Sequence, residues 1–206
     1  METVEYICRK YNIDLNKNSP FEIPCGRWGE LPKLFKDLDF KIGAEIGVLK
    51  GEWSENLFKF IPNLKMFCID KWLRYPGPTM WRQERLDRYE KEARGRLENH
   101  NCKIIKKWSM DAVKDFKNGS LDFIYIDANH TFQFVTNDIA EWSKKVRKGG
   151  IISGHDFYTK KIGHNLIVHV EDVVRAWTYL YDIHPWFVLR DNDLTSKSVS
   201  WMWIKE

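Results

Sequence analysis

Short apolar runs alternate with helical segments through most of this chain of 206 residues, and this order constrains the fold more than any other feature. Five runs have the length of buried strands, and helical spacing of apolar residues follows each of them. The alternation predicts a parallel sheet with helices on both faces. The predicted strands are 42–48, 65–69, 103–106, 121–126 and 151–153, and the predicted helices are 53–60, 82–97, 110–116, 132–146 and 170–180.

The end of the chain departs from this alternation. Two more predicted strands, 186–190 and 198–204, are joined by a short polar loop. A crossover between parallel strands needs about a dozen residues, so this pair predicts an antiparallel hairpin at the sheet edge. The predicted fold is therefore α/β, a doubly wound, Rossmann-like, mainly parallel seven-stranded sheet with a C-terminal antiparallel hairpin. Gly149 and Gly150 are expected to end the helix that precedes the fifth strand.

The first forty residues lack this regular pattern. Two short helices are predicted, over 6–11 and 31–38, with a turn at Pro20 between them. We therefore divide the chain into an N-terminal helical extension or cap, 1–40, and a main domain, 41–206. The role of 1–40 stays open between covering a site and contacting a partner.

Composition and charge exclude several classes of protein. The formal net charge is only +4 and the basic residues are scattered, which does not favour binding to nucleic acid. The four cysteines form no C-x-x-C pair, so neither a zinc knuckle nor a redox motif is expected. We find no secretory signal and no apolar run of about 20 residues, and we expect a cytoplasmic protein that does not bind membranes. The oligomeric state is open, a homo-oligomer included.

A glycine turn closes the first predicted strand of the main domain. Gly47 and Gly51 allow the backbone to turn tightly and to approach a ligand. Their G-x-x-x-G spacing differs from the G-x-G-x-x-G of dinucleotide sites, so a nucleoside with an amino-acid tail fits better than a pyrophosphate. Glu45, two residues before Gly47, suits a ligand that carries positive charge.

Polar residues follow the other predicted strands. Asp70 ends the second strand, where a carboxylate can accept hydrogen bonds from both ribose hydroxyls. Ser109 and Asp111 follow the third strand, at the expected place of an adenine edge, and Asp127 ends the fourth. Because ligands of open α/β sheets bind at the carboxyl ends of the strands, these residues predict one shared site.

Together, these motifs resemble a class I S-adenosylmethionine (SAM)-dependent methyltransferase. The later runs, Tyr125–His130 and Gly149–Asp156, resemble the small-molecule and sugar O-methyltransferases that modify macrolide sugars and glycans. The resemblance covers about 41–206, which would then be the catalytic domain. It implies transfer of a methyl group from SAM to a hydroxyl of a sugar or other small metabolite. An N-methyltransferase and a catalytically silent SAM-binding module stay open as alternatives. A nucleic-acid methyltransferase is disfavoured, since the sequence has no Asn/Asp-Pro-Pro-Tyr motif.

The resemblance also implies roles for individual residues. The methionine part of SAM would contact Glu45, Gly47 and Gly51, the ribose Asp70, the adenine Ser109 and Met110, and the sulfonium end Asp127. Related enzymes hold magnesium at the ends of the fourth and fifth strands, which implies Asp127 and Asp156 as ligands. His155 stands where those relatives have an acidic residue, and this weakens the case for magnesium because that ion prefers oxygen ligands.

Methyl transfer to a hydroxyl needs a group that takes up the hydroxyl proton. His130, three residues after Asp127, is the first candidate, and His155, oriented by Asp156, is the second. The predicted catalytic residues are therefore Asp127, His130 and His155. An aromatic loop beside the ribose end carries Trp72, Tyr75 and Trp81, whose rings could stack on a sugar.

Overall fold

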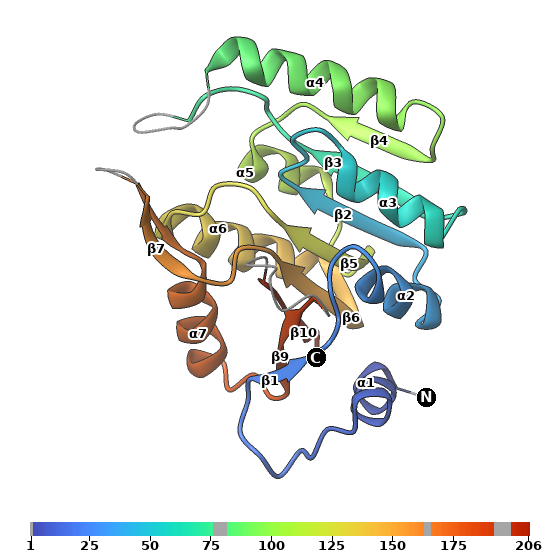
Figure 1. Ribbon diagram of the computed structural model, residues 1–206, viewed down its shortest axis with the longest axis vertical. Coiled ribbons are helices and arrows are strands. Elements are labelled where there is room, and N and C mark those ends of the chain that lie inside the picture. The colour runs from blue at the N-terminus through green and yellow to red at the C-terminus, as the bar shows by residue number, and fades with distance from the viewer. Residues whose placement is uncertain (1, 76–81, 163–165, 192–198) are drawn as a thin grey trace.

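One eight-stranded sheet with helices on both faces forms the protein, as the computed structural model shows for residues 2–75, 82–162, 166–191 and 199–206 (Figure 1). The strand order is β1-β9-β10-β6-β5-β2-β3-β4. The strands are β1 (Phe21–Ile23), β2 (Ile42–Ile46), β3 (Lys65–Ile69), β4 (Cys102–Ile105), β5 (Leu121–Ile126), β6 (Val146–Gly154), β9 (Trp186–Arg190) and β10 (Val199–Ile204).

The helices form two layers. Side chains of α1 to α4 pack in one core cluster and side chains of α5 to α7 in another, on the two faces of the sheet. None of the helices in the described ranges is long and apolar enough to cross a membrane. The helices are α1 (Thr3–Tyr11), α2 (Glu30–Asp37), α3 (Glu52–Phe60), α4 (Gln83–Leu97), α5 (Ser109–Ala112), α6 (Phe132–Trp142) and α7 (Val170–Leu180).

The sheet has the predicted parallel centre and the predicted antiparallel end. β2 pairs in parallel with β3 and β5, and β5 pairs in parallel with β6. β10 pairs antiparallel with both β6 and β9. β2 and β5 are buried at all but one position each, because helices cover both faces of these central strands.

The prediction of seven strands is wrong by one strand. β1 is the eighth strand, and it pairs in parallel with β9 at the sheet edge. Its three residues stand between Pro20 and Pro24 and are too few to show an alternating pattern. The N-terminal region also places Ile7, Leu31 and Phe35 in the core.

The predicted end of the helix before the fifth strand is also wrong. α6 ends at Trp142, a 3₁₀ turn follows, and β6 begins at Val146. Gly149 and Gly150 therefore lie inside a strand. A Cβ on Gly150 would meet the backbone oxygen of Asp122 at 2.3 Å, and the register with β5 shifts nearby. These glycines accommodate a bulge between β5 and β6.

A second, small sheet was missed by the sequence analysis. β7 (Thr159–Ile162) and β8 (Leu166–His169) pair antiparallel between β6 and α7. The backbone N–H of His169 donates to the carbonyl of His130 at 2.9 Å. The hairpin is thereby attached to the segment that follows β5.

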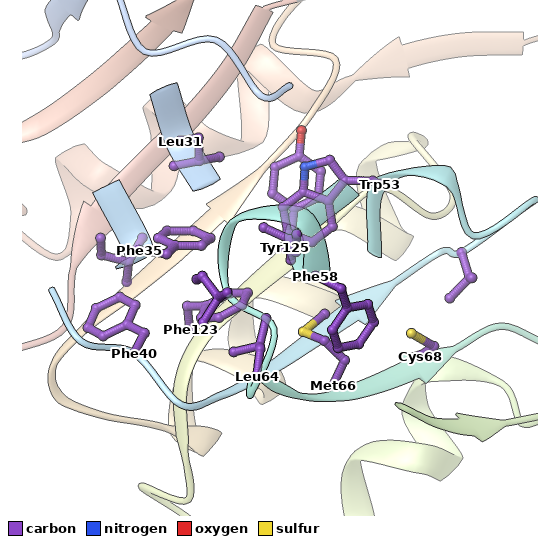
Figure 2. Close-up of a cluster of buried hydrophobic side chains, with 14 of the residues drawn as sticks. Leu31, Phe35, Phe40, Trp53, Phe58, Leu64, Met66, Cys68, Phe123 and Tyr125 are labelled. Atoms are coloured by element: carbon purple, nitrogen blue, oxygen red, sulfur yellow. The ribbon is translucent and has the colours of Figure 1, made fainter. Parts of the chain in front are cut away.

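Aromatic side chains fill the core between β5 and the helices α2 and α3 (Figure 2). The rings of Phe35 and Phe123 stack with centroids 4.2 Å apart, and those of Trp53 and Tyr125 with centroids 4.0 Å apart. This packing fixes β5 relative to α3, and both of these elements lead to the candidate site.

Candidate functional site

The carboxyl ends of β2, β3 and β5 converge on a cavity of about 360 Å³. Its lining includes most of the predicted site residues: Glu45, Gly47, Asp70, Ser109, Asp127, His130 and Asp156. Gly51, Met110 and His155 do not belong to the lining. The structure thus brings the first seven residues to one edge of the sheet, while the cofactor contacts and catalytic roles of all ten stay predictions.

Gly47 lies where the ends of β2 and β5 approach each other closely. Its φ is +93°, and a Cβ there would lie 2.2 Å from the backbone oxygen of Asp127. The backbone N–H of Asp127 in turn donates to Ile46 at 2.7 Å. Only glycine fits this turn, because any larger residue would force β2 and β5 apart.

Replacing Gly47 with alanine is therefore expected to destabilise the fold by about 2–5 kcal/mol, since it combines backbone strain with overpacking. Urea denaturation measures this change. Gly95→Ala is the matched control, because a Cβ on Gly95 meets nothing within 4 Å inside α4. That variant should be as stable as the wild type or slightly more stable. If Gly47→Ala is as stable as the wild type, the close approach of Gly47 to the backbone of Asp127 is contradicted.

Glu45 is buried next to this turn and is 2% exposed. The Ser54 hydroxyl on α3 donates to its carboxylate. Burial raises the pKa of Glu45 well above its usual range, although the bond from Ser54 and the charge of Arg27 act in the other direction. A positively charged ligand group in the cavity would favour the ionised form of Glu45.

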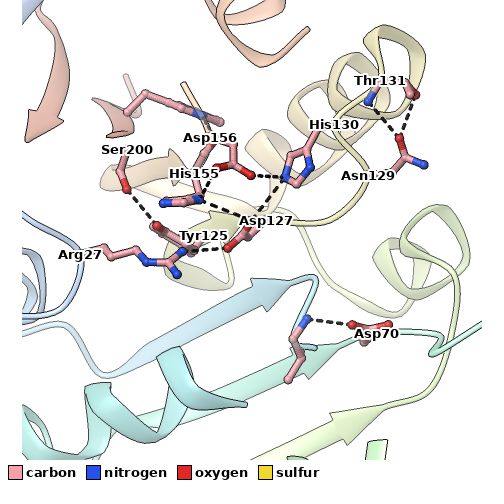
Figure 3. A network of polar contacts seen from close by, with 12 residues as sticks. Arg27, Asp70, Tyr125, Asp127, Asn129, His130, Thr131, His155, Asp156 and Ser200 are labelled. Atoms are coloured by element: carbon pink, nitrogen blue, oxygen red, sulfur yellow. Dashed lines mark hydrogen bonds and ion pairs between the residues drawn. The ribbon is translucent and has the colours of Figure 1, made fainter. Parts of the chain in front are cut away.

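The Asp70 carboxylate organises the turn after β2. One oxygen accepts hydrogen bonds from the N–H groups of Val48 and Leu49, both at 3.0 Å, and the other accepts from Trp72 at 2.8 Å (Figure 3 shows a bond from the turn). Burial raises the pKa of Asp70 despite these donors. The position of the carboxylate at the cavity wall is therefore fixed by backbone groups.

The aromatic loop differs in part from the stacking surface predicted for it. Trp72 is 1% exposed, and its indole N–H donates to the carbonyl of Leu49 at 2.7 Å, so its ring faces are buried. Tyr75 lines the cavity and packs against Trp108 and Phe134, with centroids 4.9 and 5.0 Å away. Trp81 lies outside the described residues.

Ser109 takes part in a buried contact that the sequence did not indicate. Its hydroxyl donates to Asp138 on α6 and accepts from the indole N–H of Trp142 at 2.8 Å. Burial raises the pKa of Asp138 to about 7, against the hydrogen bond from Ser109 and the charge of His130. Asp111 stands apart, exposed and paired with Lys114.

Asp127 is the centre of a charged cluster (Figure 3). One carboxylate oxygen accepts a bond from Arg27 at 3.0 Å, and the other lies 3.3 Å from Nε2 of His130 and 3.8 Å from Nδ1 of His155. Burial alone would raise the pKa of Asp127, but the bond from His130 and the neighbouring positive charges lower it to about 2. Asp127 is therefore ionised throughout the neutral range.

Asp156 joins both histidines from the end of β6. Its carboxylate lies 2.9 Å from Nδ1 of His155 and 3.2 Å from Nε2 of His130. The backbone of Asp156 is left-handed, with φ of +52°, which is uncommon for a residue other than glycine. Burial would lower the pKa of His130, but its bond to Asp127 and the charges of Asp127 and Asp156 raise it. The two carboxylates thus stabilise a proton on His130.

Arg27 is a site residue that the sequence analysis missed. It lies in the loop between β1 and α2, a hundred positions before Asp127 in the chain. No motif surrounds it, and a single arginine in an irregular segment carries no signal about its partner. Its pairing with Asp127 is visible only once the chain is folded.

The sequence matches the methyltransferase-domain family Methyltransf_24 over residues 44–157. The chain belongs to this family. The matched range contains Glu45, Gly47, Asp70, Asp127 and Asp156, whereas Arg27 lies before it. Comparison with curated proteins finds no match.

Solved structures share the fold of this methyltransferase. An O-methyltransferase from Bacillus cereus in complex with SAH is 17% identical with a TM-score of 0.60, and the match covers 98% of this chain and 90% of that one. TomG from Streptomyces achromogenes, in complex with SAM, is 15% identical with a TM-score of 0.61, and the match covers 100% of this chain and 91% of TomG. Cofactor-bound Rv0187 from MTB is 14% identical with a TM-score of 0.61, and the match covers 85% of this chain and 78% of Rv0187.

The donor groups of this methyltransferase do not favour magnesium. Asp127, His130 and Asp156 each offer one ligand atom, and these atoms lie within 4.8 Å of one another. One of the three is an imidazole nitrogen, whereas Mg²⁺ prefers oxygen ligands in octahedral geometry. A mixed set of imidazole and carboxylate suits Mn²⁺ or Zn²⁺ better. We therefore derive no catalytic step through magnesium.

Mn²⁺ is expected to bind to Asp127, His130 and Asp156 at least about tenfold more tightly than Mg²⁺ does. The electron paramagnetic resonance signal of free Mn²⁺, followed during titration with protein and then with Mg²⁺, measures this. Asp156→Asn should weaken Mn²⁺ binding, and Asp111→Asn serves as the control. Displacement of Mn²⁺ by equimolar Mg²⁺ would show that the site is an ordinary oxygen site instead.

Proposed function

We propose that this methyltransferase transfers the methyl group of SAM to a hydroxyl group of a sugar or another small metabolite. The observation that carries the proposal is that the cluster of Asp127, His130 and Asp156 lines the same cavity as Glu45, Gly47 and Asp70. One cavity is thus lined both by groups that suit a nucleoside with an amino-acid tail and by groups that suit proton transfer.

The proposed SAM site follows the strand ends. Glu45 and Gly47 would contact the methionine part, Asp70 the ribose, and Ser109 the adenine. Family membership supports a methyl donor, and neighbours of the same fold were solved with SAM or SAH. Asp70 is especially suited, because backbone bonds already fix its carboxylate at the wall of the cavity.

The proposed reaction is an in-line displacement. The acceptor oxygen forms a bond to the methyl carbon as the bond from that carbon to the sulfonium breaks, leaving SAH with a neutral thioether. The hydroxyl proton passes to Nδ1 of His130, while Nε2–H of the same ring donates to the carboxylates of Asp127 and Asp156, which stabilise the imidazolium that forms. His155 contacts Asp156 and holds its carboxylate in place. Positioning of the two reactants can supply about 7–11 kcal/mol of the barrier reduction.

A panel of hydroxylated acceptors with methyl-labelled SAM tests the proposal. We expect label in an ether product of at least one sugar or small metabolite, and labelling at least about a hundredfold slower when His130 is replaced by alanine. Label on nitrogen would indicate an N-methyltransferase. SAH binding without transfer to any acceptor would indicate a silent binding module. Either of these outcomes would contradict the proposed function.

The ribose assignment has a separate test. Asp70→Ala is expected to weaken SAH binding by about tenfold or more, because hydrogen bonds to a charged group contribute about 1.5–3 kcal/mol. Thermal shift measures it, since a hundredfold excess of ligand over Kd stabilises the wild type by about 2.7 kcal/mol. Asp111→Ala, which removes an exposed carboxylate, should bind SAH normally. Equal SAH affinity of Asp70→Ala and wild type would remove Asp70 from the site.

A further inference from the structure

Two residues of the N-terminal region line the cavity, although they precede the matched family range. They are Arg27 and Trp28, in the loop 24–29 between β1 and α2. The side-chain amide of Asn56 on α3 donates to the carbonyl of Trp28 at 2.9 Å. The backbone N–H of Leu31 donates to the carbonyl of Gly26 at 3.1 Å. The loop is thus attached to α3 and to the start of α2, which fixes it at the cavity.

Trp28 is unusual among the aromatic residues of this region. It is 42% exposed, whereas Trp53 and Trp72, which line the same cavity, are 3% and 1% exposed. The guanidinium carbon of Arg27 lies 4.7 Å from the centroid of the Trp28 ring. This cation–π contact supports the ring, while much of its surface stays open to solvent.

The same arginine connects this ring to the charged cluster. Nη1 of Arg27 donates to Asp127 at 3.0 Å, and Asp127 contacts His130 through its other oxygen. Two side chains, those of Arg27 and Asp127, therefore connect the Trp28 ring to His130, the residue that would accept the hydroxyl proton. In addition to the Arg27 guanidinium, the cavity lining here includes the carboxylates of Asp127 and Asp156 and the imidazole of His130.

We propose that the loop 24–29 forms the acceptor subsite, with the Trp28 ring as the stacking platform for a pyranose sugar. This inference rests on the proposed function. A pyranose has an apolar C–H face that packs on indole and several hydroxyls that hydrogen-bond to Arg27, Asp127 and Asp156. A planar phenol or catechol could also stack, but it has fewer hydroxyls than a pyranose and would therefore form fewer hydrogen bonds with these groups.

Binding to the SAH-saturated protein tests the subsite without knowledge of the natural acceptor. The probes are methyl glycosides of the common hexopyranoses, with catechol as the planar alternative, and saturation-transfer NMR titrations give their Kd values. We expect at least one pyranoside to bind. Trp28→Ala should weaken it about fivefold to tenfold, and Trp28→Phe should restore most of the affinity because it keeps an aromatic face.

Two further variants complete the design. Arg27→Met should also weaken the pyranoside, because it removes a hydrogen-bond donor and the charge beneath the ring. Tyr179→Ala removes an aromatic ring that is 90% exposed at the end of α7 and should leave the affinity unchanged. Absence of pyranoside binding, binding of catechol alone, or pyranoside binding that is insensitive to Trp28→Ala would each overturn the inference.

Calorimetric titration of every variant with SAH separates this inference from the proposed function. We expect Trp28→Ala and Trp28→Phe to bind SAH with the wild-type Kd. If the wild type itself does not bind SAH, the proposed function fails. If SAH binds normally and only the pyranoside results disagree, the acceptor subsite alone is wrong.

Discussion

Replacing His130 with alanine is expected to lower kcat by about 10²- to 10⁴-fold, the range that a positioned general base contributes. The reason is local: Nε2 of His130 lies 3.3 Å from Asp127 and 3.2 Å from Asp156, so both carboxylates favour its protonated form. Without the imidazole, the proton of the acceptor hydroxyl has no comparable base. Steady-state kinetics with labelled SAM and the best acceptor of the panel measures the loss.

The same variant should bind SAH within about twofold of the wild-type Kd, since the cofactor contacts proposed above do not include His130. His184→Gln is the control, because His184 lies beside β9 and hydrogen-bonds with Ser19. It should keep wild-type kcat. Wild-type kcat in His130→Ala would exclude His130 as the base and leave His155, which contacts the same carboxylates, as the remaining histidine of the cluster.

Asp138→Asn is expected to remove a large pH dependence of stability. Burial raises the pKa of Asp138 in the folded state from its usual value of 3.8 to about 7, so the folded protein holds this proton more tightly than the unfolded chain does. Ionisation of Asp138 therefore costs stability, and the free energy of unfolding should fall as the pH rises from about 4 to about 7. A shift of about three pH units corresponds to a loss on the order of 4 kcal/mol.

Urea denaturation of both proteins across this pH range measures the effect. Other groups, such as His130 with its raised pKa, titrate in the same window, so the difference between Asp138→Asn and wild type isolates Asp138. The free energy of unfolding of the variant should exceed that of the wild type by an amount that increases up to about pH 7 and then stays constant. Asp111→Asn should follow the wild type. Parallel curves for Asp138→Asn and wild type would show that Asp138 does not titrate as described.

The central sheet could be predicted because its strands are local patterns. β3 and β5 begin and end where their apolar runs do, and α7 matches the predicted 170–180. β1 could not be predicted, because its three residues become a strand only by pairing with β9, more than 160 positions later. β6 was predicted too short, because its glycines resemble a helix end in sequence and form a bulge in space.

The residues of the candidate site likewise fall into those that local sequence predicts and those that depend on distant contacts. Glu45, Gly47, Asp70 and Asp127 follow directly from strand ends, since the carboxyl ends of parallel strands meet at one edge. The places of Arg27 and Asp138 in the site depend on partners that lie 100 and 29 positions away in the sequence. No residue near either of them in the chain indicates which partner it will contact. The sequence around Trp72 predicts a ring that stacks on a sugar, whereas the fold buries this ring and bonds its indole N–H to Leu49.

A crystal structure with bound SAH tests the central claim most directly. We predict adenine beside Ser109, the ribose hydroxyls on Asp70, and the sulfur directed toward Asp127 and His130. SAH bound outside this cavity, or bound inside it with the sulfur directed away from His130, would contradict the proposed function.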